Sequence, residues 1–114
     1  MRKFLLLTII ALGAVSCATQ TQLYNWAGYD NAVYAYTKTS DAKSTESLMA
    51  VYRKLIDNSG GSRKVPPPGV CADYGFLLIQ GGKTAEGKAL LAKETTLYPE
   101  SKKFIDRILE RFER

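Results

Sequence analysis

The sequence predicts an all-α protein of about five helices, arranged as two helical hairpins followed by a C-terminal amphipathic capping helix. Apolar side chains recur at spacings of three and four residues in successive segments, which is the period of one face of an α-helix. No segment of the sequence alternates apolar and polar residues with the period of a strand. Glycine pairs and prolines separate the periodic segments, as they do in turns between helices.

The first 16 residues have the composition of a lipoprotein signal peptide. Arg2 and Lys3 precede an apolar run over residues 4–15, which is too short to cross a bilayer and suits a secretory signal. Small residues lead into Cys17, as they do where lipoprotein signal peptidase leaves an acylated cysteine. Acylation of Cys17 would hold the mature chain on a membrane without a spanning helix. A plain signal peptide, or a buried helix with a chance cysteine, is the alternative.

Residues 17–23 are predicted to be the lipidated cysteine and a polar tether, and residues 24–114 the helical domain. No acidic cluster follows Cys17, which favours an anchor that faces the periplasm. Residue 18 is alanine rather than aspartate, which in the enterobacterial pattern permits transfer to the outer membrane. We therefore expect a protein that is lipid-anchored in the cell outer membrane, on its periplasmic side.

The charge of the mature chain is mild and mixed in sign. Two of the 16 lysines and arginines belong to the predicted signal peptide, so the mature chain has 14 basic and 11 acidic residues and a net charge of +3 (14 − 11). Nucleic acid is not an expected partner, because its binding surface would be a stripe of one sign. The chain has no histidine, the commonest general base and metal ligand, so no metal and no cofactor is expected. Cys71 lies in an apolar stretch and is expected to be a core residue rather than a reactive thiol.

The first hairpin is predicted between residue 24 and about residue 57. Its first helix covers residues 24–38 and has one aromatic face, formed by Trp26, Tyr29, Val33 and Tyr36. A turn-rich break over residues 39–44 offers several helix N-caps. The second helix starts near Thr45, and its apolar stripe consists of Leu48, Met49, Tyr52, Leu55 and Ile56.

Residues 68–80 and 84–97 are predicted to form the second hairpin. Proline extends the residue before it, and Pro68 can serve as the first helical residue because its missing N–H costs nothing there. Gly81 and Gly82 mark the turn, and Pro99 ends the second helix. Ser101 can cap a last helix, one side of which is apolar and carries Phe104, Ile105, Ile108, Leu109 and Phe112.

Residues 68–101 resemble one tetratricopeptide unit, which needs small residues where its two helices cross and a proline at its end. Gly75 and Gly87 take the small positions, and Leu91 takes a bulky one. Glu94 stands where the pattern has alanine, so we expect a slight splay or an outward-facing Glu94. The first hairpin repeats the scheme loosely, with a six-residue insertion in its turn around residues 39–44. An unrelated five-helix bundle is the alternative.

The chain also resembles a family of small bacterial tetratricopeptide-like lipoproteins of unknown function. The matching pieces are the cysteine at position 17 and, in order, LYNWAGYDNAVYAY, PPGVCADYGFLL and ETTLYPESKKFIDRIL. Members of this family are often encoded beside a lipoprotein similar to the curli secretion channel. The resemblance therefore implies a shared envelope complex of lipoproteins. The loop that contains Gly60, Gly61 and three prolines departs from the expected pattern.

The function that we expect is a non-catalytic protein–protein interaction or assembly module on the outer membrane, in an envelope lipoprotein complex related to secretion. Tetratricopeptide hairpins bind partners on the concave face formed by their first helices. Tyr34 is the best candidate for recognition because it leaves the core stripe of its helix. The expected partner-binding residues are Tyr34, Asn31, Tyr24, Phe76 and Ile79, with Ala27 and Ala72 beside them. This set contains no lysine or arginine, so we expect an apolar contact rather than a carboxylate clamp.

The alternative is an enzyme of the cell envelope, or an accessory factor, that acts on cell wall or lipid. A glycosidase needs two carboxylates across a cleft, whereas the carboxylates here lie on helix surfaces of alternating charge. No motif pairs a nucleophile with a base. We therefore assign no catalytic residue and do not expect an enzyme. A structural spacer for a secretion pore is a third possibility.

Overall fold

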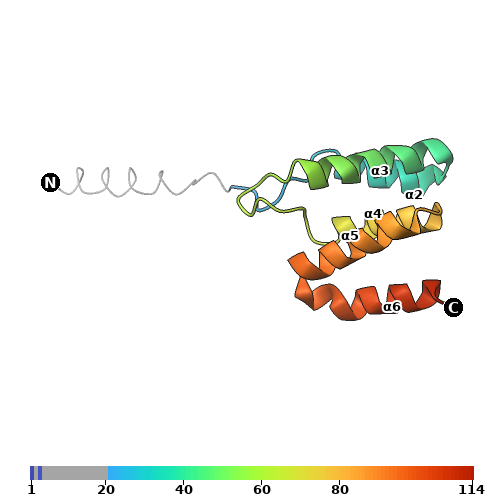
Figure 1. The fold of residues 1–114 in the computed structure, drawn as a ribbon. Helices are drawn as coiled ribbons and strands as arrows, with labels where there is room; N and C mark the ends of the chain where they lie inside the picture. Colours follow the sequence, from blue (N-terminus) through green and yellow to red (C-terminus); the bar gives the residue numbers. More distant parts are fainter. Residues whose placement is uncertain (2, 4–20) are drawn as a thin grey trace.

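The structure is a computed structural model that describes residues 21–114, together with residues 1 and 3 (Figure 1). Cys17 and most of the predicted signal peptide lie outside the described residues. In the described part of the chain, five α-helices and one short 3-10 helix follow one another, and there is no strand. The expected all-α fold with about five helices is therefore confirmed. None of these helices is both long and apolar enough to cross a membrane.

The helices form two hairpins and a final single helix. The first hairpin consists of α2 (Tyr29–Thr39) and α3 (Ala42–Asp57), and the second of α4 (Val70–Gln80) and α5 (Thr84–Leu97). The 3-10 helix η2 (Pro99–Ser101) then leads into α6 (Lys102–Phe112). α4 packs on α3 as well as on α5, so the hairpins stack, and α6 packs on α5 (Figure 1).

α2 begins at Tyr29, later than predicted, because two local features end the preceding turn there. The Asn25 side chain accepts a hydrogen bond from the Ala27 N–H at 3.0 Å, and Gly28 adopts a left-handed conformation with φ of 81°. Trp26 therefore lies before the helix, 41% exposed, with its ring edge-on to Tyr29 at a centroid distance of 4.9 Å. The prediction that Trp26 belongs to the helical stripe of α2 was wrong.

The turn between α2 and α3 contains only Ser40 and Asp41. Ser40 adopts a left-handed conformation with φ of 49° and ends α2, while the Asp41 carboxylate accepts a hydrogen bond from the Ser44 N–H at 2.7 Å and caps α3. The residue types that predicted a loop are thus used as helix caps. The predicted six-residue insertion around residues 39–44 was wrong.

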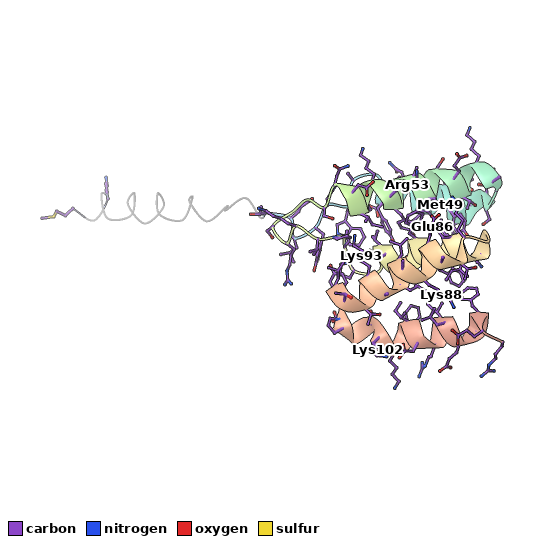
Figure 2. All side chains as sticks on the ribbon, viewed as in Figure 1. Met49, Arg53, Glu86, Lys88, Lys93 and Lys102 are labelled. Atoms are coloured by element: carbon purple, nitrogen blue, oxygen red, sulfur yellow. The ribbon has the colours of Figure 1, made fainter. Side chains whose placement is uncertain are left out.

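Two hydrophobic clusters form the core. The first joins the hairpins and contains Ala32, Leu48, Tyr52, Leu55, Val70, Tyr74 and Leu78. The second lies under the last helix and contains Ala72, Ile79, Leu91 and Ile105. Full burial of one such side chain contributes about 1.5–3 kcal/mol to stability. Ile105 is the fully buried side chain of α6, and Ile108 and Leu109 are half-buried beside it, so these residues hold α6 on the domain. Figure 2 shows side chains of neighbouring helices pointing into the space between them.

α4 and α5 come closest where Gly75 faces Gly87. A Cβ atom added at Gly87 would lie 2.5 Å from the Gly75 carbonyl oxygen and 2.5 Å from Cγ1 of Ile79. A Cβ atom added at Gly75 would lie 2.7 Å from the Gly87 carbonyl oxygen. Both distances are far below van der Waals contact, so only glycine fits. The expectation that small residues permit a close crossing here is confirmed.

α4 begins at Val70 rather than at Pro68, because Gly69 before it adopts a left-handed conformation with φ of 90°. Gly69 has no side chain that could cap the helix. The carboxylate of Glu94, from α5, takes this role by accepting hydrogen bonds from the Gly69 N–H at 2.7 Å and the Ala72 N–H at 3.3 Å. Glu94 is 2% exposed, so of the two alternatives expected for it, the one in which it faces outward was wrong.

The start of α6 also differs from the prediction. The Ser101 side chain makes no capping bond to α6 and instead donates a hydrogen bond to the Tyr98 carbonyl oxygen at 2.7 Å. The Tyr98 hydroxyl in turn donates to the Pro66 carbonyl oxygen at 2.6 Å. These bonds fix the α5–α6 connection to the proline segment.

The loop between the hairpins is fastened to the segment that enters the domain. The Ser62 N–H donates to the Gln22 carbonyl oxygen at 3.0 Å, and the Arg63 N–H donates to the Leu23 carbonyl oxygen at 3.1 Å. Gly61 has a φ of 75°, and any side chain there would collide with the Leu23 carbonyl group. The last residues of the predicted tether are therefore held against this loop.

Candidate functional site

A groove of about 310 Å³ opens between the first helices of the two hairpins. We call it the inter-hairpin groove; its lining residues are Tyr29, Val33, Tyr36 and Thr37 of α2, Leu48 and Tyr52 of α3, and Asp73, Phe76 and Leu77 of α4. A groove on this face was expected, but a different stripe of α2 lines it. The half-buried stripe that was assigned to the core also forms the wall of the groove.

The predicted partner-binding residues of the first hairpin lie outside this lining. Tyr34 is 68% exposed on α2, and Asn31, three residues earlier on the same helix, is also exposed. Tyr24 is half-buried before the helix, next to Tyr98, whose pKa is raised by burial and by the neighbouring Tyr24 hydroxyl. A role for these three residues in recognition stays a prediction.

The second hairpin contributes one of its three predicted residues to an open surface. Phe76 is half-buried and lines the inter-hairpin groove. Ile79 is only 8% exposed, and it packs with Ala72 against Leu91 and Ile105. The structure thus places Ile79 and Ala72 in the core rather than in a groove, because α6 folds over this side of α4.

Asp73 gives the inter-hairpin groove a carboxylate that the sequence prediction missed. The Tyr52 hydroxyl donates a hydrogen bond to Oδ2 of Asp73 at 3.4 Å. Desolvation raises the pKa of the Asp73 carboxyl, and this hydrogen bond opposes the rise. Burial, and then the Asp73 charge, raise the pKa values of the phenols of Tyr29 and Tyr52, which therefore stay protonated donors at neutral pH. The spacing of Asp73 and Phe76, three residues apart on one helix, was the available signal.

A row of aromatic rings runs behind the groove from the segment before α2 to α4. The ring centroids of Tyr29 and Tyr52 are 6.2 Å apart, and those of Tyr52 and Tyr74 are 6.3 Å apart. Arg53 of α3 ends the row, because its Nε and Nη2 atoms donate to the Tyr74 hydroxyl at 3.3 and 3.2 Å. Figure 2 labels Arg53 on α3. The row fixes the wall of the groove against the core.

A second groove, of about 400 Å³, lies between α4 and α6. We call it the α4–α6 groove; its lining residues are Phe76, Phe104, Arg107, Ile108, Arg111 and Phe112. Phe104 is 60% exposed and Phe112 is 38% exposed, although both belong to the apolar side predicted for the last helix. That side is wider than the surface that α4 and α5 cover. The expectation of a binding face without lysine or arginine therefore does not extend to α6.

Phe76 belongs to both grooves and connects them. Its ring lies 5.6 Å from that of Phe112, centroid to centroid, and it also lines the inter-hairpin groove beside Asp73. The first helices of the hairpins and α6 thus share one aromatic surface. The surface has a carboxylate at the α2 side and two guanidinium groups at the α6 side.

The described residues include no group of three or more histidine, cysteine or acidic side chains that could hold a metal ion. Cys71 is fully buried, as expected of a core residue, and burial raises the pKa of its thiol to about 11. Glu94 is occupied by the N-terminus of α4.

Neither curated proteins nor solved structures include a match to this chain. A family model described as a domain of unknown function, DUF4810, matches residues 23–108. The match begins at Leu23, which is held against the loop between the hairpins, and it ends within α6. It therefore covers the inter-hairpin groove and most of the helical domain, whereas Arg111 and Phe112 of the α4–α6 groove lie beyond it. The chain belongs to the DUF4810 family, whose function is unknown.

Proposed function

We propose that this protein is a non-catalytic protein–protein interaction module, lipid-anchored to the outer membrane through Cys17, in an envelope lipoprotein complex related to secretion. We further propose that its two hairpins are tetratricopeptide-like. The glycine crossing of α4 and α5 and the stacking of the second hairpin on the first support this assignment. The partner would be another envelope lipoprotein, as the resemblance to small bacterial lipoproteins implies.

The inter-hairpin groove is the observation that carries the proposal. Its walls are aromatic and aliphatic side chains, most of them half-buried, and such side chains supply large contact areas at protein interfaces. Asp73 adds a hydrogen-bond acceptor beside these walls. A partner that inserts one apolar side chain and offers a backbone N–H or a cationic group would satisfy both parts of the groove.

Two hairpins form only a short groove, which limits the kind of partner. A groove of about 310 Å³ accommodates one or two side chains rather than a long peptide. Docking onto a folded partner, with Tyr34 and Asn31 as additional exposed contacts, therefore fits better than wrapping of an extended chain. A protein that docks onto a folded partner in this way would serve in the assembly of the envelope lipoprotein complex.

Site-specific crosslinking in intact cells tests the proposal. A photo-reactive amino acid at Thr37, which lines the groove and is exposed, should crosslink one partner reproducibly. The same amino acid at Lys54, which is exposed on α3, is the matched control and should not crosslink it. Asp73→Asn should reduce the Thr37 crosslink. Equal crosslinking from both positions would refute a partner site in the groove.

Two further measurements test the remaining parts of the proposal. Tyr34→Ala should weaken partner capture while leaving the thermal midpoint unchanged, because the ring is largely exposed. A lower midpoint would instead show that Tyr34 serves packing. Mass spectrometry of the mature N-terminus should find an acylated Cys17, and an unmodified N-terminus would remove the membrane anchor.

A further inference from the structure

The α4–α6 groove combines an apolar floor with two cations. Phe76, Phe104 and Phe112 form the floor with Ile108, and Arg107 and Arg111 stand at its edge. Aromatic surface left open next to arginine is typical of the centre of protein interfaces. At about 400 Å³, the groove has room for one or two large side chains.

The two arginines of the groove are free to pair with an external anion. In the described residues, the ion pairs are Lys88 with Glu113 at 3.6 Å and Lys102 with Asp106 at 2.6 Å. Neither pair uses Arg107 or Arg111, and both arginines are exposed. Figure 2 shows Lys88 between α5 and α6, and Lys102 on α6.

Both arginines of the groove lie on one flank of α6. Residues three or four positions apart share a side of a helix, which groups Phe104, Arg107 and Arg111 on one flank. Asp106 and Glu110 line a separate hollow together with Lys102, Lys103 and Arg107, so cations accompany the acidic side chains there. The lining of the α4–α6 groove contains two arginines and no acidic residue, so an occupant with negative charge complements it.

We propose that the α4–α6 groove binds an acidic segment of a partner protein. One large apolar side chain of that segment lies against Phe76, Phe104 and Phe112, and its carboxylates pair with Arg107 and Arg111. Guanidinium groups bind carboxylates through two parallel hydrogen bonds, which orients the segment as well as attracting it. The inference rests on the proposed role as an interaction module and adds the chemistry of the partner.

A peptide titration on the full acylated chain in detergent tests this inference. The probe is a fluorescein-labelled, C-terminally amidated peptide of sequence Glu-Glu-Leu-Phe-Glu-Glu, followed by fluorescence anisotropy. The comparison peptides are Gln-Gln-Leu-Phe-Gln-Gln, which lacks the charges, and Glu-Glu-Gly-Ser-Glu-Glu, which lacks the apolar side chains. The first peptide should bind about tenfold more tightly than the uncharged one, the difference expected from a few partly exposed ion pairs.

Two double variants of equal charge separate the groove from general attraction. R107Q/R111Q should reduce binding of the acidic peptide to the level of the uncharged peptide. K54Q/K93Q removes the same charge from exposed positions on α3 and α5 and should change binding less than about twofold. Phe104→Ala should weaken binding of both peptides that carry Leu-Phe. Unchanged thermal midpoints would show that all three variants fold.

Three outcomes would overturn the inference. One is equal loss of binding in the two double variants, which would show non-specific attraction. Another is equal affinity for the charged and uncharged peptides. The third is self-association of the chain that R107Q/R111Q abolishes while the acidic peptide fails to bind, which would assign the groove to a second copy. Crosslinking from Thr37 reports on the other groove, so it separates failure of this inference from failure of the proposed function.

Discussion

Replacing Glu94 by alanine removes the group that one helix of the second hairpin supplies to the other. The Glu94 carboxylate, 2% exposed on α5, accepts hydrogen bonds from the N–H groups of Gly69 and Ala72 at the start of α4. The first N–H groups of a helix have no partner within the helix, and Gly69 offers no side chain in place of Glu94. The substitution therefore leaves both N–H groups without their acceptor.

The cost follows from the desolvation of these two donors. A buried donor that loses its partner costs about 1–3 kcal/mol, so two of them cost about 2–6 kcal/mol. Gly69 is half-buried and can regain water, which brings our expected loss to about 3 kcal/mol in the free energy of unfolding. In a domain of this size, that loss corresponds to roughly 12–24 °C in Tm.

Urea denaturation followed by far-ultraviolet circular dichroism measures this loss. Lys93→Ala is the matched control, because Lys93 is the exposed neighbour on α5 and gains the same helix propensity on substitution (Figure 2). We expect the control to change the free energy of unfolding by less than about 0.5 kcal/mol. If Glu94→Ala is no more destabilising than Lys93→Ala, the carboxylate does not cap α4 as described.

The same carboxyl predicts a pH dependence of stability. Burial raises the pKa of Glu94, and the hydrogen bonds from Gly69 and Ala72 oppose the rise. The native state therefore retains a proton where the unfolded chain, with a glutamate pKa of about 4.3, has lost it. This contribution to stability is complete below about pH 4.3 and is lost as the pH rises through the raised native value. The free energy of unfolding of the protein minus that of Glu94→Gln should fall over this range, and a rise would contradict the burial argument.

Two further predictions concern the second hairpin. Gly87→Ala should destabilise the protein by about 1–3 kcal/mol in urea denaturation, because the new Cβ atom would lie 2.5 Å from the Gly75 carbonyl oxygen. In an open helix the same change would stabilise by about 1 kcal/mol, so a more stable variant would refute the close crossing. Cys71 should resist alkylation by iodoacetamide at pH 8 and react on unfolding, because its thiol is fully buried and has a pKa of about 11. Mass spectrometry that finds rapid alkylation of the native protein would show that this part of the core opens.

Features that depend on neighbouring residues were predicted well from the sequence. The bounds of α5 agree with the predicted residues 84–97, because Gly82 before it and Pro99 after it act within a few residues. The stripe of α3 is buried where its period indicated. The close approach of Gly75 and Gly87 was expected from the resemblance of residues 68–101 to a tetratricopeptide unit, which has small residues at these positions.

Local capping is the exception, because the same residue types serve as loops and as caps. Ser40 and Asp41 predicted a long turn, yet they end one helix and begin the next. Gly28 and Gly69 moved the starts of α2 and α4 by adopting left-handed conformations. Sequence composition indicates that such residues interrupt a helix, but it does not say on which residue the helix resumes.

By itself the sequence determined the fold class and the order of the helices, because periodicity and helix stops act along one segment at a time, and the resemblance to a tetratricopeptide unit indicated the close crossing of the second hairpin. Tertiary structure alone decided that Glu94 turns inward, that α6 buries Ile79, and that Asp73 and Arg107 edge the two grooves. These outcomes depend on which helix faces which across the core. The sequence of a helix specifies which side chains it can bury, whereas the neighbouring helix that packs on it determines which of those side chains stay exposed.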